Sequence, residues 1–482
     1  MGFKPTLEQE NIVKASLAEN MLKVNSCAGS GKSSSLKMLA NAMPKASLYL
    51  AFNKAIADEA STEFPSHVAC KTTHSLAFAK YGKKIVHKLN RPKGRYVNVA
   101  GTPAEIARYY DIKDYTMGGD TVSARPIASI VKHAVRVFEQ SDAENITTQH
   151  VPFYMIAEVC EPRPNIDKRS LVEHVFKYAK KLWDDRCDTH SPVLATHDTY
   201  LKLFQLSKPK LNYDIIYVDE AQDSNGPVLD IVMRQTHAKV VFVGDSFQGI
   251  YAFRGAVNAM EQVECPTMYL TKSFRYGQAI ADVATAIIKG AMEIEGFEQV
   301  ESNVGPVDTS EPYTMLFRTN GCLLENAAAL IEEGVEISCE IDTNDFKKLV
   351  QSGVALFKGD QKDVKHDSVV PYAEWDELVE ASSDDPELKR LARIVTSNPD
   401  KFLTNLQYMK KKDEAHVTLT TAHKSKGRQW DQVVLGPDFP EVDAETGLKE
   451  QERNLLYVAA TRAIKTLELN PTAMFLVEDY WQ

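Results

Sequence analysis

The stretch SCAGSGKSS (residues 26–34) lies between an apolar segment of strand length, LKVNS (22–26), and a helical segment that begins at about Lys32. A phosphate-binding loop requires this context, because glycines let the backbone curl until its N–H groups point at phosphate oxygens. Lys32 is expected to reach the β- and γ-phosphates, and the Ser33 hydroxyl to ligate Mg²⁺. Ser26 replaces the first glycine of the general pattern. A glycine-rich turn with an exposed lysine is the alternative, and the register of glycines, lysine and serine disfavours it.

A second segment, YDIIYVDEAQDS (213–224), is an apolar strand that ends in two carboxylates. Asp219 at the strand end can hold Mg²⁺, directly or through its water shell. Glu220 can then act as the general base that polarises the attacking water. Paired carboxylates could instead cap the following helix. With a phosphate-binding loop upstream, the two segments together predict hydrolysis of a nucleoside triphosphate.

Length and composition are those of a soluble globular protein. The chain has 482 residues, of which 44% are hydrophobic and 25% charged, and this length allows roughly three or four domains. No apolar run approaches the roughly 20 residues that a membrane helix needs, and MGFKPTLEQE at the start lacks a signal-peptide layout. A cytoplasmic location without membrane contact is expected. Seven cysteines without a C-x-x-C pair are typical of reduced thiols.

The net charge of −10 argues against a protein that coats nucleic acid by bulk attraction, but it allows a local strand-binding groove. Basic clusters occur at 83–95, 177–181 and 202–210. Such clusters are usually solvated faces, and contact with DNA is the alternative at each of them.

Strand-length apolar runs alternate with helical segments at both ends of the chain, which is typical of parallel α/β units. The predicted strands are 22–26, 47–52, 213–219, 239–245, 314–317, 416–421 and 432–436. Two insertions interrupt them: 85–205, mostly helical, and 345–412, more polar. In the first insertion two helix faces are expected to form a core. Their residues are Val131, Ala134, Val135 and Phe138, and Leu171, Val175, Phe176, Ala179, Leu182 and Trp183.

Seven further segments complete a recognisable order of motifs. They are PTLEQ (5–9), AFNKAIADEA (51–60) with KTTHSLAF (71–78), VGDSFQGIYAFRGA (243–256), LTKSFRYG (270–277), and TTAHKSKGRQWDQVV (420–434) with ERNLLYVAATRA (452–463). From Gln9 to about Ala463, this order resembles the UvrD/PcrA/Rep group of superfamily 1 DNA helicases. The sequences of the motifs are most similar to the F-box DNA helicase branch. The two insertions carry no resemblance.

The resemblance implies an α/β fold with two RecA-like parallel-sheet P-loop domains, a helical insertion in the first and a small insertion in the second. The expected boundaries are 1–84 with 206–269 for the first domain, 85–205 for the helical subdomain, 270–344 with 413–482 for the second domain, and 345–412 for the small insertion.

The resemblance also implies an ATP site with Mg²⁺. Its catalytic residues are expected to be Lys32, Asp219, Glu220, Gln248, Arg275 and Arg462. The ATP-binding set is Gln9, Ala28, Gly29, Ser30, Gly31, Lys32, Ser33, Ser34, Phe274, Arg275, Gln429 and Arg462, and the metal ligands are Ser33 and Asp219. Gln9 would read adenine, Phe274 would stack on it, and Gln248 would sense the γ-phosphate. Arg275 and Arg462 can neutralise transition-state charge, and both lose that partner after hydrolysis, which would switch the two lobes from closed to open.

Single-stranded DNA contacts are implied for a further set: Asn53, Lys54, Thr73, His74, Ser75, Tyr251, Phe253, Arg254 and His423. Polar and basic side chains would contact phosphates. Aromatic rings offer a stacking surface that tolerates any sequence. Core packing is the alternative for Phe253, and a structural role is the alternative for His74.

Three departures from the family pattern limit these expectations. Gln429 stands where the family has a glutamate that meets the ribose, and it can hydrogen-bond without a charge. The 345–412 insertion is much shorter than the family's regulatory subdomain. The chain ends soon after the last motif, so the strand-separating hairpin of better-known relatives is expected elsewhere or not at all. Trp430, which follows Gln429 in the motif at 420–434, is expected in the core rather than on DNA.

The resulting hypothesis is an ATP-dependent 3′–5′ DNA helicase or single-stranded DNA translocase in repair, recombination or replication. Its polarity rests wholly on the resemblance. Its expected partners are single-stranded DNA, tailed duplex DNA, and recombination or replication proteins. Its expected location is the cytoplasm, associated with a nucleoid or in a phage-infected cell, or the nucleus in a eukaryote. One alternative is a translocase that strips proteins from single-stranded DNA without efficient unwinding. Another is an ATP-gated DNA-binding module.

Overall fold

The computed structural model describes residues 4–482 except 90–99, 102, 253–254, 341–342, 367, 371, 373, 383–385, 406–408, 410–414 and 444. The chain divides into two compact units. The first comprises Met1–Val24, Ser34–Gly244 and Tyr251–Met268, and the second Asn25–Ser33, Asp245–Ile250 and Tyr269–Gln482.

The first sheet has six strands in the order β3-β2-β6-β7-β1-β8. Their bounds are β1 Met21–Ser26, β2 Ser47–Leu50, β3 Val68–Lys71, β6 Ile215–Val218, β7 Lys239–Gly244 and β8 Thr267–Leu270. Pairing is parallel between β2 and β3, β2 and β6, and β6 and β7. Strands β2 and β6 are buried at every position, as expected for parallel strands covered on both faces.

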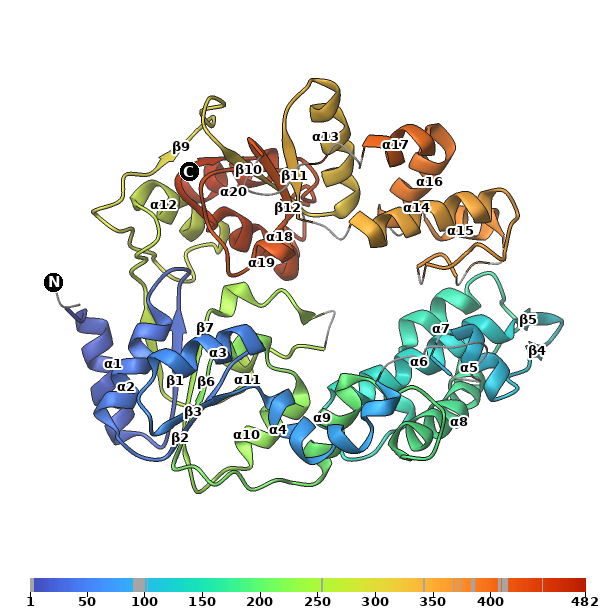
Figure 1. The fold of residues 1–482 in the computed structure, drawn as a ribbon, viewed down its shortest axis with the longest axis horizontal. Helices are drawn as coiled ribbons and strands as arrows, with labels where there is room; N and C mark the ends of the chain where they lie inside the picture. The colour runs from blue at the N-terminus through green and yellow to red at the C-terminus, as the bar shows by residue number, and fades with distance from the viewer. Residues whose placement is uncertain are drawn as a thin grey trace. The chain divides into compact units, whose positions relative to one another are not determined.

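Helices alternate with the strands of this sheet along the chain, as the sequence predicts (Figure 1). They are α1 (Leu7–Ala18), α2 (Lys32–Ala42), α3 (Lys54–Glu63), α4 (Thr73–Lys80), α10 (Gly226–Met233) and α11 (Ala259–Gln262). Side chains cap five of them, because Thr6, Asn53, Thr72, Asn225 and Asn258 each accept a hydrogen bond from the backbone of the first turn. These caps define where the helices begin.

The first insertion is helical, as predicted. It contains α5 (Pro103–Tyr109), α6 (Ala124–Gln140), α7 (Phe153–Cys160), α8 (Lys168–Cys187) and α9 (His197–Leu206). The two predicted faces of α6 and α8 form its buried core, with Phe176 partly buried against it. A short antiparallel hairpin, β4 (Tyr115–Met117) with β5 (Asp120–Val122), was not predicted.

The second sheet also has six strands, in the order β11-β12-β10-β13-β14-β9. Their bounds are β9 Asn303–Val304, β10 Tyr313–Phe317, β11 Ile337–Cys339, β12 Val417–Thr421, β13 Trp430–Leu435 and β14 Ala463–Glu468. All its pairs are parallel. Its helices are α12 (Gln278–Ile287), α13 (Asn320–Glu332), α18 (Ala422–Ser425), α19 (Glu450–Ala460) and α20 (Pro471–Trp481).

The second insertion adds α14 (Thr343–Phe357), α15 (Trp375–Ala381), α16 (Pro386–Ser397) and α17 (Pro399–Asn405), with a small core of their own. Two parallel sheets with an insertion in each half confirm the predicted fold class. Among the described residues, no helix is long and apolar enough to cross a membrane.

Candidate functional site

The loop after β1 has the backbone that a phosphate cradle needs. Gly29 and Gly31 have φ of +79° and +78°, a region that side chains disfavour. A Cβ at Gly29 would lie 2.7 Å from Cβ of Arg275, so only glycine fits there. The buried Ser30 hydroxyl has no hydrogen-bond partner among the described residues. An orphaned donor inside a glycine-rich loop that leads into α2 fits a bound phosphate group.

Residues of the second unit fix this loop in place. The Ser273 hydroxyl donates to the carbonyl of Ala28 at 2.8 Å, and the backbone N–H of Phe274 donates to the carbonyl of Gly29 at 2.8 Å. The Phe274 ring packs edge-on against Phe297, with 5.4 Å between ring centres. The structure therefore brings the predicted loop and the predicted segment 270–277 together.

Asp245 is a buried hydrogen-bonding centre beside the loop. Nε2 of Gln248 donates to its Oδ2 at 2.7 Å, and the Tyr457 hydroxyl donates to the same oxygen at 3.2 Å. The Tyr457 oxygen also accepts from the backbone N–H of Ala28 at 3.2 Å. Burial first, and Asp245 next, raise the pKa of Tyr457. One tyrosine thus joins the phosphate loop to the Asp245–Gln248 pair.

Arg275 lies in the same unit with both ends of its guanidinium engaged. Its Nε donates to Oε1 of Gln429 at 3.0 Å, and its Nη1 donates to the carbonyl of Thr461 at 2.8 Å. Burial lowers the pKa of Arg275. Gln429, predicted to meet the ribose, is here the acceptor that orients Arg275.

Arg462 is 1% exposed and is held by its own unit. Its Nε donates to the carbonyl of Val458 at 2.8 Å, its Nη1 to the carbonyl of Arg428 at 3.2 Å, and its Nη2 to the Thr461 hydroxyl at 3.1 Å. Burial, and then the charge of Arg275, lower the pKa of Arg462 to about 9. Thr461 therefore accepts from both predicted arginines.

The two predicted carboxylates follow β6 in the first unit. The Tyr49 hydroxyl donates to Oδ2 of Asp219, and Oδ1 of Asp219 accepts from the backbone N–H of Glu220 at 2.9 Å. Glu220 has φ of +49°, which costs of order 1–3 kcal/mol and is typical of functional positions. Nε2 of Gln222 donates to Oε2 of Glu220 at 2.5 Å.

Gly244 at the end of β7 makes room for this turn. A Cβ there would meet Oε1 of Gln222 at 2.4 Å and the backbone nitrogen of Ala221 at 3.2 Å. The carboxylate turn can therefore pack against β7 only because residue 244 has no side chain.

Gln9 is buried and its amide is engaged at both ends. Its Oε1 accepts from the backbone N–H of Thr6 at 3.1 Å, and its Nε2 donates to the Ser35 hydroxyl on α2 at 3.1 Å. It thereby links the start of α1 to the helix that follows the phosphate loop. The adenine-reading role of Gln9 stays a prediction, as do the predicted roles of Lys32, Ser33 and Ser34 at the start of α2.

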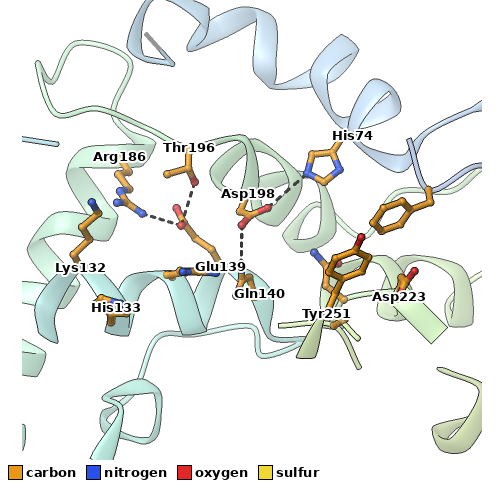
Figure 2. Close-up of a pocket in the computed structure, with 14 residues that line it drawn as sticks. His74, Lys132, His133, Glu139, Gln140, Arg186, Thr196, Asp198, Asp223 and Tyr251 are labelled. Carbon is orange, nitrogen blue, oxygen red and sulfur yellow. Dashed lines mark hydrogen bonds and ion pairs between the residues drawn. The ribbon is translucent and has the colours of Figure 1, made fainter. Parts of the chain in front are cut away.

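The residues predicted to contact DNA fall into two groups. In the first unit, Phe52 and Tyr251 stack with 5.7 Å between ring centres and 9° between planes, and Phe52 is exposed. Nε2 of His74 lies 3.6 Å from Oδ1 of Asp198 (Figure 2). In the second unit, His423 is half-buried on α18. Phe253 and Arg254 lie outside the described residues.

For four of the residues predicted to contact DNA, the structure shows hydrogen bonds or a degree of burial that the motifs do not predict. The Asn53 side chain caps α3, by accepting from the backbone N–H of Ile56 at 2.9 Å. The Ser75 hydroxyl donates to the carbonyl of Thr72 at 2.8 Å, and Thr73 is buried. Lys54 is exposed at the start of α3.

Sequence reasoning missed Phe52 and Tyr457. Both stand inside quoted motifs, at 51–60 and 452–463, and each gains its meaning only from a partner far along the chain. The one signal for Phe52 in the sequence was that it is an aromatic residue directly before Asn53.

Comparisons with known proteins cover most of this chain. The model of a UvrD-like helicase C-terminal domain matches residues 416–469, and the model of an AAA domain matches residues 9–254. The chain is 31% identical to F-box DNA helicase protein 1 of Schizosaccharomyces pombe, over 97% of this chain and 57% of that protein. It is 32% identical to F-box DNA helicase 1 of Gallus gallus, over 98% of this chain and 50% of that protein. The chain thus spans about half the length of these relatives.

Proposed function

This chain belongs to the superfamily 1 DNA helicases of the UvrD-like group, in the F-box DNA helicase branch, and from that premise we propose that it couples ATP hydrolysis to 3′–5′ movement along single-stranded DNA and to duplex separation. Single-stranded and tailed duplex DNA are the proposed substrates. The family resemblance supports the polarity and a role in repair, recombination or replication.

The proximity of buried Arg462 and half-buried Arg275 beside the phosphate loop carries the proposal. Arg275 and Arg462 both donate to Thr461, and Arg275 also flanks Gly29. Two like charges that are partly or wholly removed from water disfavour each other unless an anion joins them. A triphosphate on the loop supplies that anion, and its developing negative charge in the transition state would strengthen the contact.

The remaining chemistry falls to the first unit's carboxylates. Glu220 is proposed to accept the proton of the attacking water, and Gln222 orients its carboxylate through the hydrogen bond to Oε2. Asp219 and Ser33 are proposed to hold Mg²⁺, which supplies positive charge to the phosphate oxygens when bound. The Tyr49 hydroxyl fixes the Asp219 carboxylate in one orientation.

A short covalent path connects the nucleotide residues to the strand-binding residues. Nε2 of Gln248 donates a hydrogen bond to Asp245, and Tyr251 lies three positions beyond Gln248 along the chain. Tyr251 stacks on Phe52, and such rings bind bases of any identity at roughly 1–3 kcal/mol per base. A motor that walks on any sequence needs that tolerance.

Phosphate release with and without a single-stranded oligonucleotide tests the proposal. Turnover should rise strongly with the oligonucleotide and vanish in Lys32→Ala. A rate that ignored the oligonucleotide would remove DNA as the substrate, even if ATP were hydrolysed.

A further inference from the structure

We propose that Asp198 and Gln140 of the helical insertion are positioning residues that hold the His74 side chain in place for a phosphate of the single strand. The inference rests on the proposed function, in which His74 contacts single-stranded DNA. Asp198 and Gln140 stand in none of the motifs that resemble the family. Together with His74 they line a pocket of about 540 Å³ in the first unit, so the three side chains meet at one cavity.

Two residues of α9 hold the His74 ring. His74 lies in the first turn of α4 and Asp198 in the first turn of α9, and these two helices pack against each other. Oδ1 of Asp198 lies 3.6 Å from Nε2 of His74 (Figure 2). The Tyr200 ring meets the His74 ring edge-on, with 5.9 Å between ring centres. A carboxylate at one nitrogen fixes the orientation of an imidazole, so Nδ1 of His74 is the atom presented to a phosphate.

Gln140 fixes the Asp198 carboxylate. Nε2 of Gln140, the last residue of α6, donates to Oδ2 of Asp198 at 3.0 Å (Figure 2). A Cβ at Gly255 would lie 2.5 Å from Oε1 of Gln140, so glycine leaves room for this amide. Burial raises the pKa of Asp198, but the hydrogen bonds of His74 and Gln140, with the charge of Arg136, outweigh it and lower that pKa. Asp198 is therefore a carboxylate with a different partner at each oxygen.

The backbone that carries Asp198 is fixed by Glu139, the neighbour of Gln140. Thr196 caps α9, and Glu139 accepts from the hydroxyls of Thr199 at 2.5 Å and of Thr196 at 3.3 Å. Nη1 of Arg186 on α8 donates to Glu139 at 2.8 Å, and both side chains are buried. A buried hydrogen-bond network makes its members rigid. Helix α6 thus fixes both the turn that bears Asp198 and the carboxylate itself.

The direction of one effect separates positioning from bulk electrostatics. DNA is a polyanion, so removing a carboxylate from its binding site should by itself strengthen binding. We expect the reverse for the full chain with a fluorescent oligo-dT. Asp198→Asn should bind roughly threefold to fivefold more weakly, as for a partly exposed charge pair. Gln140→Leu should also weaken binding, because it releases the same carboxylate without changing the net charge.

A double-mutant cycle tests whether both residues act through His74. His74→Ala should weaken binding by itself, and adding Asp198→Asn or Gln140→Leu to it should cause no further loss. A role in folding alone would add its loss in either background, and the melting temperature of each variant would follow that loss. Binding by Asp198→Asn as tight as that of wild type, or a further loss in the His74→Ala background, would overturn the assignment.

Asp185 on α8 supplies a matched control. Its Oδ2 accepts from the Tyr110 hydroxyl at 2.7 Å, and it is not among the described residues that line the pocket. Asp185→Asn makes the same change in net charge and should bind like wild type, so an equal loss there would also overturn the assignment. Such a failure with DNA-stimulated hydrolysis intact in wild type would leave the proposed function standing. Absence of that stimulation would refute the proposed function itself.

Discussion

The buried hydroxyl of Tyr457 donates a hydrogen bond to Oδ2 of Asp245 across 3.2 Å. The Tyr457 hydroxyl oxygen in turn accepts a hydrogen bond from the backbone N–H of Ala28 in the phosphate loop. A residue of α19 thus fixes both the loop and the Asp245–Gln248 pair.

Tyr457→Phe should therefore weaken ATP binding and slow hydrolysis while preserving the fold. Removing one buried partner leaves the others unsatisfied, at about 1–3 kcal/mol, so the KM for ATP should rise. Phosphate release against ATP concentration measures this. The change Tyr480→Phe on α20 is a control that should leave the KM unaltered, and an unaltered KM in Tyr457→Phe would make that hydroxyl irrelevant to the site.

Glu220→Gln should abolish turnover and leave ATP binding intact. The amide keeps the shape of the carboxylate and loses its basicity, so the attacking water cannot be deprotonated. Turnover together with binding of a fluorescent ATP analogue checks both halves, and Lys32→Ala should reduce both. Near-normal hydrolysis by Glu220→Gln would assign the general base to another group.

Arg462→Ala should preserve single-strand binding and remove DNA-stimulated hydrolysis. Because Arg462 is buried with three hydrogen-bond acceptors, the variant should also unfold at a lower temperature. The Arg275 side chain is less deeply buried. Arg275→Ala therefore separates the loss of DNA-stimulated hydrolysis from the loss of stability. If both variants hydrolysed ATP like wild type, neither arginine would act on the γ-phosphate.

The helical insertion should lose stability below about pH 6.5. Burial lowers the pKa of His150 and of His174, so the unfolded chain takes up protons first as the pH falls through its ordinary histidine range. This stability is fully present above that range and declines as the pH drops toward the folded-state pKa values. The melting temperature at pH 7.5 and 5.5 measures it.

His174→Phe should reduce that pH dependence, because His174 packs against Tyr115 and Tyr178 and its Nε2 has no hydrogen-bond partner among the described residues. The exposed His190 is the control, and His190→Gln should melt like wild type at both pH values. A pH dependence in His174→Phe equal to that of wild type would contradict the account.

Local signals explain what the sequence could predict. The phosphate loop, the Asp219–Glu220 pair and the strands around them depend on residues adjacent in the chain, so their patterns are readable. Amphipathic spacing likewise predicted the α6–α8 core. The β4–β5 hairpin was missed because three-residue strands are too short to show alternation.

Long-range packing explains the remainder. Lys88 and Lys202 belong to predicted basic clusters, yet both are buried. Lys88 donates to the carbonyl of Asp185 at 2.7 Å, and Lys202 to the carbonyl of Ser141 at 2.8 Å. Conversely, Lys132 and Arg136 stand in no cluster and line the pocket. Charge density along the chain could not distinguish a structural lysine from one that faces a groove.

Strand displacement with ATP and Mg²⁺ tests the helicase activity most directly. It is measured on two duplexes, one with a 3′ single-stranded tail and one with a 5′ tail, while phosphate release is followed. We expect unwinding of the 3′-tailed duplex alone, with phosphate release stimulated by the tail. Phosphate release stimulated by both tails without displacement would contradict the helicase claim, and would point instead to a translocase that strips proteins from the strand.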